Sequence, residues 1–567
     1  MSAFSLEELN SREEVNTTGL NVAAKTIERL YSKYADDPQI FAKMHNYICF
    51  RLPALIEEMK RTGDERRLRN EYLSTEQDSF ICSFLNDNQY YYCPQTELYF
   101  HYNGRNYATK REDDVLHHIL TSITKECNAL IPRKPQTKVY IMKRIKEMNP
   151  LKSIPESATI QSVLDSLCPA IFAAKTAAKY FLTVLGDNLL KKTDETTHAY
   201  FTTPKAKEFL REVAAISQSL FGVSATATFK YKYHSHAFKT IRLVQMNNTA
   251  GVEPIWRPIL QLRAIDLLCV AAHYSGRYES ADQYLEMYSN DAELVKYATH
   301  FRWKVAKDVV AEFAAEYFRT SEDAENKITE STMEYLWRKY LKEHKFPAVL
   351  GSQGFLSTAI EYFPGKHDKD AACFRGLVSS HSVVIDQFQK FWKECIVVDK
   401  TDPLAEYEVD ELVMLYRHWS KNSGSSSCSQ ESITESQMLE LIRYYQDVEI
   451  IDNKFAQGVK SGLWDKQQDL SGFFSEFCKV TEREEISFYD AYTAYQSFCK
   501  SPSNGEVGDC VYKNEIKILN SEIRNGWDFI AENSSRIISK KYFETYIYAA
   551  FEQDAVQNGK ICLRVTY

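Results

Sequence analysis

The stretch YYYCPQTELYFHYNGRNYAT, residues 90–109, indicates most directly which fold this chain adopts. Its runs of tyrosine and phenylalanine favour short β-strands, and the runs are interrupted near Pro94 and at Asn103-Gly104, a strong turn signal. The acidic pair at 113–114 then opens a helical pattern, and helical patterns precede the stretch as well. The sequence therefore predicts a mainly α protein with small β elements, an α+β chain.

Length and charge limit the class of protein. The 567 residues are too many for a single core, so we expect about three or four domains. A net charge of −8 argues against a protein coated in basic surface. It still allows a local basic groove, because nucleic-acid binding depends on the local field.

Cysteine usage and the N-terminus indicate the compartment. The 13 cysteines are scattered and contain no CxxC pair, which is typical of reduced thiols in a cytosolic or nuclear protein. The N-terminus, MSAFSLEELN, lacks the pattern of a secretory signal. No apolar run approaches the ~20 residues of a membrane span. We therefore expect a protein that is neither secreted nor embedded in a membrane.

The sequence pattern divides the chain into six parts. They are a helical N-terminal region (1–70), a small α+β domain (71–150), a mixed, mainly helical domain with a short sheet (151–345), a helical module (346–419), a linker (420–435) and a C-terminal helical, winged-helix-like module (436–567). The linker, SKNSGSSSCSQESITE, is rich in serine, and Thr434 with Gln437 predicts a capping box at its end.

The first region shows helical spacing followed by basic residues. The apolar positions recur three and four residues apart, at Leu20, Ala23, Ala24, Ile27, Leu30 and Tyr31. The basic cluster that follows consists of Lys60, Arg61, Arg66, Arg67 and Arg69.

An internal repeat is indicated across the linker. FWKEC (391–395) precedes DELVMLYRHW (410–419), and FSEFC (474–478) precedes YDAYTAYQSF (489–498). Each half pairs an aromatic helix ending at Cys with a helix ending in Tyr-x-x-aromatic. Duplication explains this pattern, and so does a helical core spacing that unrelated helices share.

Common catalytic motifs are absent from the sequence. It has no GxxxxGK[ST] loop to cradle phosphates, and GxGxxG, GxSxG and HExxH do not occur. We therefore expect a non-enzymatic protein without a cofactor.

Aromatic and basic residues alternate in FKYKYHSHAFKTIRL, residues 229–243. On a strand, Lys230 and Lys232 share one face while Tyr231 and Tyr233 share the other. An amphipathic strand with its aromatics in the core explains this alternation. A nucleic-acid platform explains it too, with lysines on phosphates and a tyrosine stacked on a base.

A third interpretation of the same stretch is a metal site. His234 and His236 would point the same way on a strand, and imidazole is a common zinc ligand. Cys269 or His273 would then have to supply a further ligand.

Two further basic clusters stand out. RKPQTKVYIMKRIKEMN (133–149) includes Arg133, Lys134, Lys143 and Arg144, and Glu147 is the only acid between 128 and 155. A solvated helix face explains this cluster, and so does a phosphate-binding surface.

The other cluster is SKKYF (539–543), in which Ser539 is a predicted N-cap that places Lys540 and Lys541 in the first helical turn. Cations are unfavourable at that end of the helix dipole unless an anion approaches, as in a winged-helix contact. Two exposed lysines at a small cost in free energy are the alternative.

Three stretches resemble proteins of nucleocytoplasmic large DNA viruses: KSIPESATIQSVLDSL (152–167), AKYFLTVLGDNLLKK (178–192) and FKYKYHSHAFKTIRLV (229–244). LYFHYNGRNYAT (98–109) and the helices ending at Trp419 and Phe498 are similar to regions flanking the ATPase core of poxvirus-type primase-helicases. That core is missing here, so helicase activity is not implied. The resemblance implies a replication or transcription accessory in the virus factory of the host cytoplasm or in the virion.

These observations lead to one functional expectation and one alternative. We expect a nucleic-acid-associated accessory protein that binds DNA or RNA. The alternative is a virion or scaffold protein that binds other viral proteins through aromatic surfaces. The residues expected to contact nucleic acid are Lys230, Lys232, Arg133, Lys134, Lys143, Arg144, Lys540 and Lys541 at phosphates, with Tyr231 or Tyr233 stacking on a base.

Overall fold

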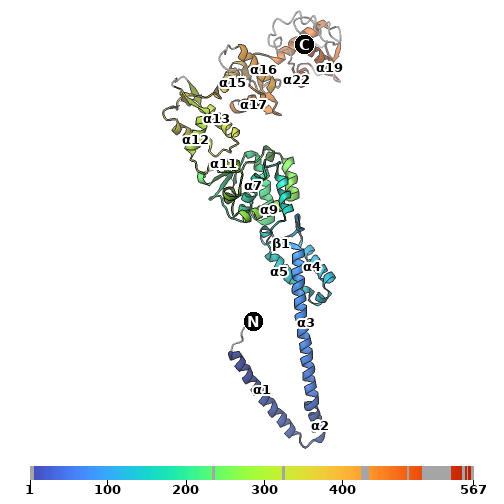
Figure 1. Ribbon diagram of the computed structural model, residues 1–567. Coiled ribbons are helices and arrows are strands. Elements are labelled where there is room, and N and C mark those ends of the chain that lie inside the picture. Colours follow the sequence, from blue (N-terminus) through green and yellow to red (C-terminus); the bar gives the residue numbers. More distant parts are fainter. Residues whose placement is uncertain are drawn as a thin grey trace. The chain divides into compact units, whose positions relative to one another are not determined.

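The structure is a computed structural model (Figure 1). It describes residues 6–232, 236–321, 323, 326–422, 433–481, 484–500, 538–551, 556–557 and 560–563, with side chains from residue 19 onward except at 476 and 500. Contacts divide the chain into two compact units. The first is Met1–Tyr231 with Thr240–His300, and the second is Lys232–Lys239 with Phe301–Tyr567. The protein is mainly helical with small sheets, as the sequence predicts.

The first unit begins with a long helical arm. It consists of α1 (Leu6–Lys33), α2 (Pro38–Asn46), the π-helical turn η1 (Tyr47–Arg51) and α3 (Leu52–Asp87). Asp37 caps α2, since its Oδ1 accepts hydrogen bonds from two backbone amides at 3.1 Å. No described side chain between residues 19 and 72 is buried, so the arm is anchored only by the end of α3.

The aromatic stretch forms a three-stranded antiparallel sheet in the order β1-β2-β3. Its strands are β1 (Gln89–Cys93), β2 (Leu98–Tyr102) and β3 (Tyr107–Lys110), and Gly104 makes the predicted turn with a φ of +84°. Alternate residues face two different cores, because Tyr90 and Tyr99 belong to one cluster while Tyr91 and Phe100 belong to the other.

The core that contains Tyr90 and Tyr99 is covered by two helices joined by a 3₁₀ segment. These are α4 (Glu112–Glu126), η2 (Asn128–Arg133) and α5 (Lys134–Glu147). The end of α3 contributes Phe80 and Phe84 to the same cluster. The arm, the sheet and α5 therefore meet in one small hydrophobic core.

The other core is mainly helical and is centred on α7 (Lys175–Leu189) and α9 (Glu253–Tyr278). These helices pack very closely, because a Cβ on Gly186 would lie 2.1 Å from the carbonyl oxygen of Ala271. The surrounding helical segments are η3 (Pro150–Lys152), α6 (Ser157–Leu167), η4 (Pro204–Ala206), α8 (Lys207–Phe221), η6 (Asn248–Gly251), α10 (Ala281–Gln283), η7 (Tyr284–Tyr288) and α11 (Ala292–Ala298). The short η5 (Phe238–Thr240) spans the division between the two units. A parallel sheet in the order β5-β4-β6 completes the core, from β4 (Ala199–Phe201), β5 (Phe229–Lys230) and β6 (Ile241–Leu243).

In its described residues, the second unit contains the same succession of elements three times. Each module has a helix, a strand, two helices and two strands, and the first strand pairs with the last one in the order first-third-second. The first module is α12 (Ala306–Tyr317), β8 (Lys327–Thr329), α13 (Glu330–Glu343), α14 (Ser352–Tyr362), β9 (His367–Asp368) and β10 (Cys373–Arg375). The second is α15 (Ser382–Cys395), β13 (Glu406–Glu408), α16 (Val409–Asn422), α17 (Glu435–Tyr445), β14 (Ile450–Ile451) and β15 (Phe455–Gln457).

In its described residues, the third module is α18 (Lys466–Val480), β17 (Glu485–Ser487), α19 (Phe488–Lys500), α22 (Lys540–Ala550), β18 (Val556–Gln557) and β19 (Lys560–Cys562). Two extra strand pairs repeat as well, β7 (Arg319–Thr320) with β11 (Leu377–Val378) and β12 (Ile396–Val398) with β16 (Val459–Ser461). This order of elements and strands is the winged-helix topology, so the C-terminal modules are winged-helix-like as expected.

Core positions of the first strand and of the second helix recur every 79 residues in the three modules. The residue at the centre of the first strand is Ile328, Tyr407 or Ile486, and each is buried and paired with the centre of the third strand. The second helices repeat the pattern at four buried positions, namely Met333, Leu412 and Ala491, then Leu336, Leu415 and Ala494, then Trp337, Tyr416 and Tyr495, then Tyr340, Trp419 and Phe498. The repeat that the sequence indicates across the linker is therefore present, and it extends to a third copy.

Two details of the predicted organisation can be placed in these modules. The predicted boundary between 345 and 346 falls inside the first module, between α13 and α14. Most of the predicted linker, residues 423–432, lies outside the described residues. At its end, the predicted capping box is confirmed, because Thr434 accepts from the backbone of Gln437 and Gln437 accepts from the backbone of Thr434.

Candidate nucleic-acid interface

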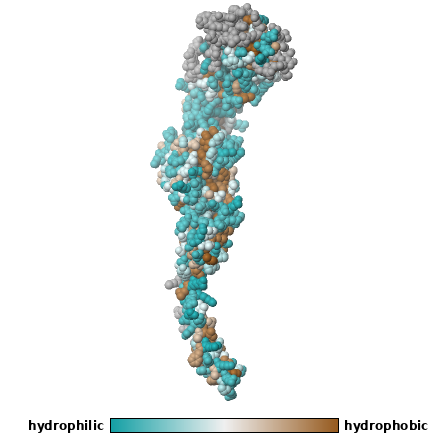
Figure 2. All heavy atoms as spheres, turned by 90° about the vertical axis from the view of Figure 1, so that its right-hand side faces the viewer, coloured by the Kyte–Doolittle hydropathy of each residue, from teal (hydrophilic) through white to brown (hydrophobic). Residues whose placement is uncertain are grey.

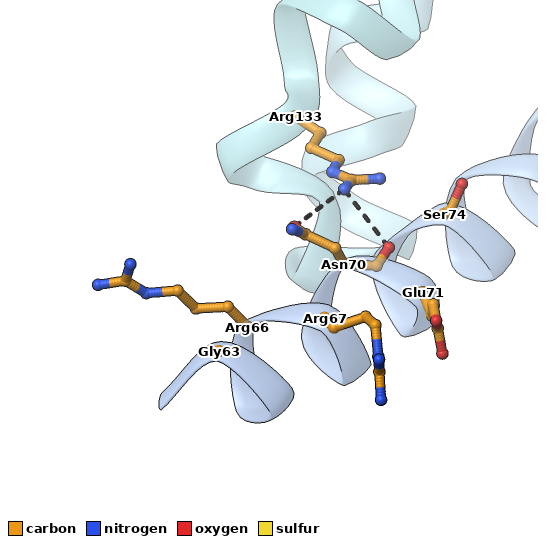
Figure 3. Close-up of a pocket in the computed structure, with 7 residues that line it drawn as sticks. All are labelled: Gly63, Arg66, Arg67, Asn70, Glu71, Ser74 and Arg133. Atoms are coloured by element: carbon orange, nitrogen blue, oxygen red, sulfur yellow. Dashed lines mark hydrogen bonds between the residues drawn. The ribbon is translucent and has the colours of Figure 1, made fainter. Parts of the chain in front are cut away.

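Three arginines from two separate segments line one shallow hollow of about 670 Å³ at the junction of the arm and the small domain (Figure 3). Arg66 and Arg67 come from α3, and Arg133 comes from the end of η2. Gly63, Asn70, Glu71 and Ser74 complete the lining.

Arg133 connects the two segments that line the hollow. Its guanidinium donates to the carbonyl oxygen of Asn70 at 3.4 Å and to Asn70 Oδ1 at 3.3 Å. Figure 3 shows Arg133 reaching toward Asn70, whereas Arg66 and Arg67 extend away from α3 in different directions. The site is therefore an open basic surface that suits an extended polyanion better than a small enclosed ligand.

The neighbouring arginines differ in how they are neutralised. Arg67 forms an ion pair with Asp64 at 3.3 Å, and Arg61 pairs with Glu58 at 2.7 Å. Both pairs are exposed, so they are weak and exchange readily for another anion. Arg66 has no ion pair with any residue in the described part of the chain, so its charge is available to a ligand.

The basic residues of α5 lie on both ends of that helix. Lys134 is half-buried and donates to Thr124 Oγ1 at 2.7 Å. Lys143 and Arg144 are exposed near its C-terminal end, and neighbouring Lys146 lies 5.6 Å from the ring of Tyr92. Arg133, at the end of η2, precedes Arg144 of α5 by 11 positions, or about 16 Å along a helix, so the two can contact only well-separated phosphates.

The stretch at 229–243 is organised differently from the predicted platform. The alternating residues form a strand, β5, only at Phe229 and Lys230, and the second strand of the stretch is β6 at Ile241–Leu243. Lys230 Nζ lies 3.1 Å from Glu195, and only 12% of the lysine side chain is exposed. Tyr231 packs against the hydrophobic core, and burial raises its pKa to about 12. Lys232 is exposed, while Tyr233 lies outside the described residues. The aromatic side of this stretch therefore faces the core, as the amphipathic interpretation predicts, and Lys230 is paired.

The two lysines of α22 lie in the third winged helix. Ser539 is the predicted cap and accepts from the backbone of Tyr542. Lys540 forms an exposed pair with Glu544 at 3.7 Å. Lys541 lies 4.2 Å from the ring centroid of Phe455, which belongs to β15 of the preceding module. Lys541 therefore contributes to packing between two modules.

The third helix of the second module, α17, also packs on a neighbouring module. Tyr444 and Tyr445 of α17 pack on Tyr335 of α13, with ring centroids 5.2 and 5.6 Å apart. The hydroxyl of Tyr444 donates to the carbonyl oxygen of Ser331 at 3.1 Å. In the helix-turn-helix mode of DNA binding this helix enters the major groove. Here it is used to stack one module on the next.

The described residues give little support to the predicted metal site. Cys269 is fully buried in α9, and burial raises its pKa well above the usual thiol value. Burial lowers the pKa of His273, and His234 lies outside the described residues. Within the described part of the chain no group of three His, Cys, Asp or Glu side chains is arranged to hold a metal ion.

Comparison of this chain with protein-family models, with curated proteins and with solved structures gives no match. Among the described helices, none is long and apolar enough to cross a membrane.

Sequence reasoning noticed the basic cluster at 60–69 but did not connect it with Arg133. The two segments are more than sixty residues apart, and no local pattern predicts that η2 folds against α3. The first winged-helix module was also missed. The recurrence of its aromatic and apolar positions after 79 residues was the available signal.

Proposed function

We propose that this protein is a non-enzymatic, nucleic-acid-associated accessory protein. It binds DNA or RNA through the basic surface at the junction of the helical arm and the small domain. The observation that carries the proposal is that Arg66, Arg67 and Arg133, from two separate segments, line one open hollow. Guanidinium groups suit phosphates because their planar donors can form paired hydrogen bonds. The viral setting, with the host cytoplasm or the virion as location, rests on the resemblance alone.

The charge distribution supports placing the contact in the first unit. Residues 301–567 contain 32 Lys and Arg against 42 Asp and Glu, whereas residues 1–300 contain 37 against 35. A polyanion is repelled by an acidic surface and attracted to a local excess of arginine. The winged-helix modules are therefore assigned a supporting role in this proposal, and α3 with α5 is assigned the contact.

Binding of fluorescent single- and double-stranded DNA and RNA across a salt series tests the proposal. The variant Arg66→Gln/Arg67→Gln/Arg133→Gln is expected to bind more weakly. On duplex DNA, the slope of log affinity against log salt should become shallower by about 0.9 for each lost phosphate contact. Because the effect is electrostatic, it should be similar for all sequences tested.

A matched control removes the same kind of charge elsewhere in the first unit. Arg211 and Arg257 are exposed and paired with Glu208 and Glu253 on their own helices. The variant Arg211→Gln/Arg257→Gln should leave affinity and salt slope unchanged. Equal binding by the triple variant and the wild-type protein would contradict the proposal.

A second candidate function is a scaffold that binds other proteins, and one observation favours it. The third helices of the second and third modules pack against neighbouring modules through Tyr444 and Lys541. Acidic winged helices stacked in this way are better suited to hold protein partners than DNA. Absence of binding to every nucleic acid at low salt would favour this candidate.

A further inference from the structure

The helical arm carries apolar side chains that nothing covers among the described residues. Leu20 of α1 and Met59 of α3 are each 73% exposed, and Ile56 of α3 is 56% exposed. Figure 2 shows apolar residues of this arm at the surface near the bottom of the view. Such a concentration on a helix that is otherwise solvated marks a face that packs against something.

The apolar face of α3 continues a seam that is buried at its other end. Leu73, Gln77, Phe80 and Phe84 are buried against the small domain at spacings of four, three and four residues. Stepping back with the same spacing leads through Asn70, Arg66 and Gly63, which are not apolar, to Met59, Ile56 and Leu52 of α3 and then to Cys49 of the π-helical turn η1. A seam that repeats every 3.5 residues is the pattern by which one helix packs along another. The occupant of the uncovered half is therefore a helix.

The helix α1 carries a matching seam. Its apolar positions with the same spacing are Leu20, Ala23, Ile27 and Leu30. If α1 runs antiparallel to α3, these positions pair with α3 at a constant sum of residue numbers, which an antiparallel coiled coil requires. The resulting layers are Leu30 with Cys49, Ile27 with Leu52, Ala23 with Ile56, and Leu20 with Met59. In one of these layers the small Ala23 faces the large Ile56.

At one end of the arm, α1 already packs against α2, the helix that leads through η1 into α3. The hydroxyl of Tyr31 lies 3.0 Å from His45 Nδ1, and its ring packs on Phe41 with centroids 5.2 Å apart. Only the short turn after Lys33 separates α1 from α2, so α1 is held close to α3 at one end. Tethering of this kind gives α1 a high effective concentration near α3. The tether favours α1 of the same chain over a helix from another molecule.

We infer that α1 is a strap that folds back along α3 as an antiparallel helical pair. In the same register, residues 9–16 of α1 lie beside residues 63–70 of α3, which line the basic hollow. The sequence from 6 to 16 contains four glutamates and one arginine. The closed strap therefore competes with a polyanion for the hollow. This competition, unlike the closure itself, rests on the proposed nucleic-acid function.

Site-specific photo-crosslinking of the full chain tests the closure. A benzophenone amino acid at position 59, Met59→p-benzoylphenylalanine, should crosslink within one chain to α1 peptides around Leu20. The matched control places the same group at Leu68, which is 63% exposed on α3 but off the seam, and should not capture α1. Equal capture of α1 from both positions, no capture from position 59, or capture only between two chains would overturn the closure.

A variant that opens the strap tests the competition. Leu20→Asp/Ile27→Asp places charges in the seam and should abolish the crosslink from position 59. It should also bind nucleic acid several-fold more tightly than the wild-type protein. Unchanged affinity, with the crosslink lost, would overturn the competition. If neither protein binds any nucleic acid, the proposed function and the competition both fail, whereas the crosslink still decides the closure.

Discussion

The ammonium of Lys466 lies 2.9 Å from Oε2 of Glu411, and this ion pair joins two winged-helix modules. Lys466 begins α18 of the third module, and Glu411 belongs to α16 of the second. Both side chains are buried, and burial raises the pKa of Glu411. Tyr542 and Tyr407 cover the ammonium, with ring centroids 4.0 and 4.6 Å away. The pair and its aromatic cover therefore fix the second and third modules against each other.

Removing one partner of this pair should destabilise the second unit strongly. Lys466→Met leaves Glu411 buried without its counter-charge, so we expect a loss of about 3–5 kcal/mol in the free energy of unfolding. Urea denaturation measures the change. The double variant Lys466→Met/Glu411→Leu should recover most of the loss, because no buried charge remains. If the double variant is as unstable as the single one, packing and not charge dominates this contact.

The stability of the third module should fall as the pH rises through the acidic range. Asp469 is buried beneath Trp464 and Tyr495, and burial raises its pKa from 3.8 to about 7. The folded state therefore keeps a proton that the unfolded state releases, and stability is lost between about pH 4 and about pH 7 at about 1.4 kcal/mol per pH unit. Denaturation at several pH values measures this slope.

The variant Asp469→Asn identifies the group responsible for that slope. Its amide oxygen still accepts from Trp464 and Tyr495, so the variant should be more stable than the wild-type protein near neutral pH. Its free energy of unfolding should also change less with pH. The exposed Asp452→Asn serves as the control and should keep the wild-type slope. An unchanged slope in Asp469→Asn would assign the pH dependence to another group.

The contact between α7 and α9 should not tolerate a side chain at Gly186. A Cβ there would lie 2.1 Å from the carbonyl oxygen of Ala271 and 2.6 Å from Ser275 Cβ. Gly186→Ala is expected to cost about 1–3 kcal/mol through overpacking. Gly276 of α9 has open space around its Cα, so Gly276→Ala should stabilise the protein by up to about 1 kcal/mol. Thermal denaturation of the two variants should give shifts of opposite sign.

Asp282 should be needed to hold Arg242 in the core of the first unit. Arg242 donates to both carboxylate oxygens, at 2.8 and 2.7 Å, and only 3% of its side chain is exposed. Burial alone would raise the pKa of Asp282, but hydrogen bonds from His198 and Arg242 lower it well below its ordinary value. The stabilisation is therefore present at neutral pH and lost only in strong acid.

The corresponding variant is Asp282→Asn, which removes the carboxylate charge opposite the buried guanidinium of Arg242. It is expected to destabilise the first unit by about 3–5 kcal/mol. The exposed Asp165→Asn, which removes a surface pair with Lys175, should cost less than about 1 kcal/mol. Equal losses in both variants would contradict the structural role of the buried pair.

Local patterns predicted several elements correctly because their causes are local. The turn at Asn103-Gly104, the capping box of Thr434 with Gln437 and the cap at Ser539 each depend on residues within a few positions of one another. The repeat across the linker was visible for the same reason, since Tyr416 and Tyr495 occupy equivalent positions in short helical patterns.

By itself, the sequence determined the mainly helical class, the short aromatic strands and the amphipathic helices, because spacing and turn chemistry act between near neighbours. Only the tertiary structure decided which charges meet. It brought Arg133 to Asn70 and the α3 arginines, paired Lys230 with Glu195, and packed Lys541 on Phe455. These contacts join residues that lie far apart in the chain. Which of them form depends on how whole elements pack, and composition carries no record of that packing.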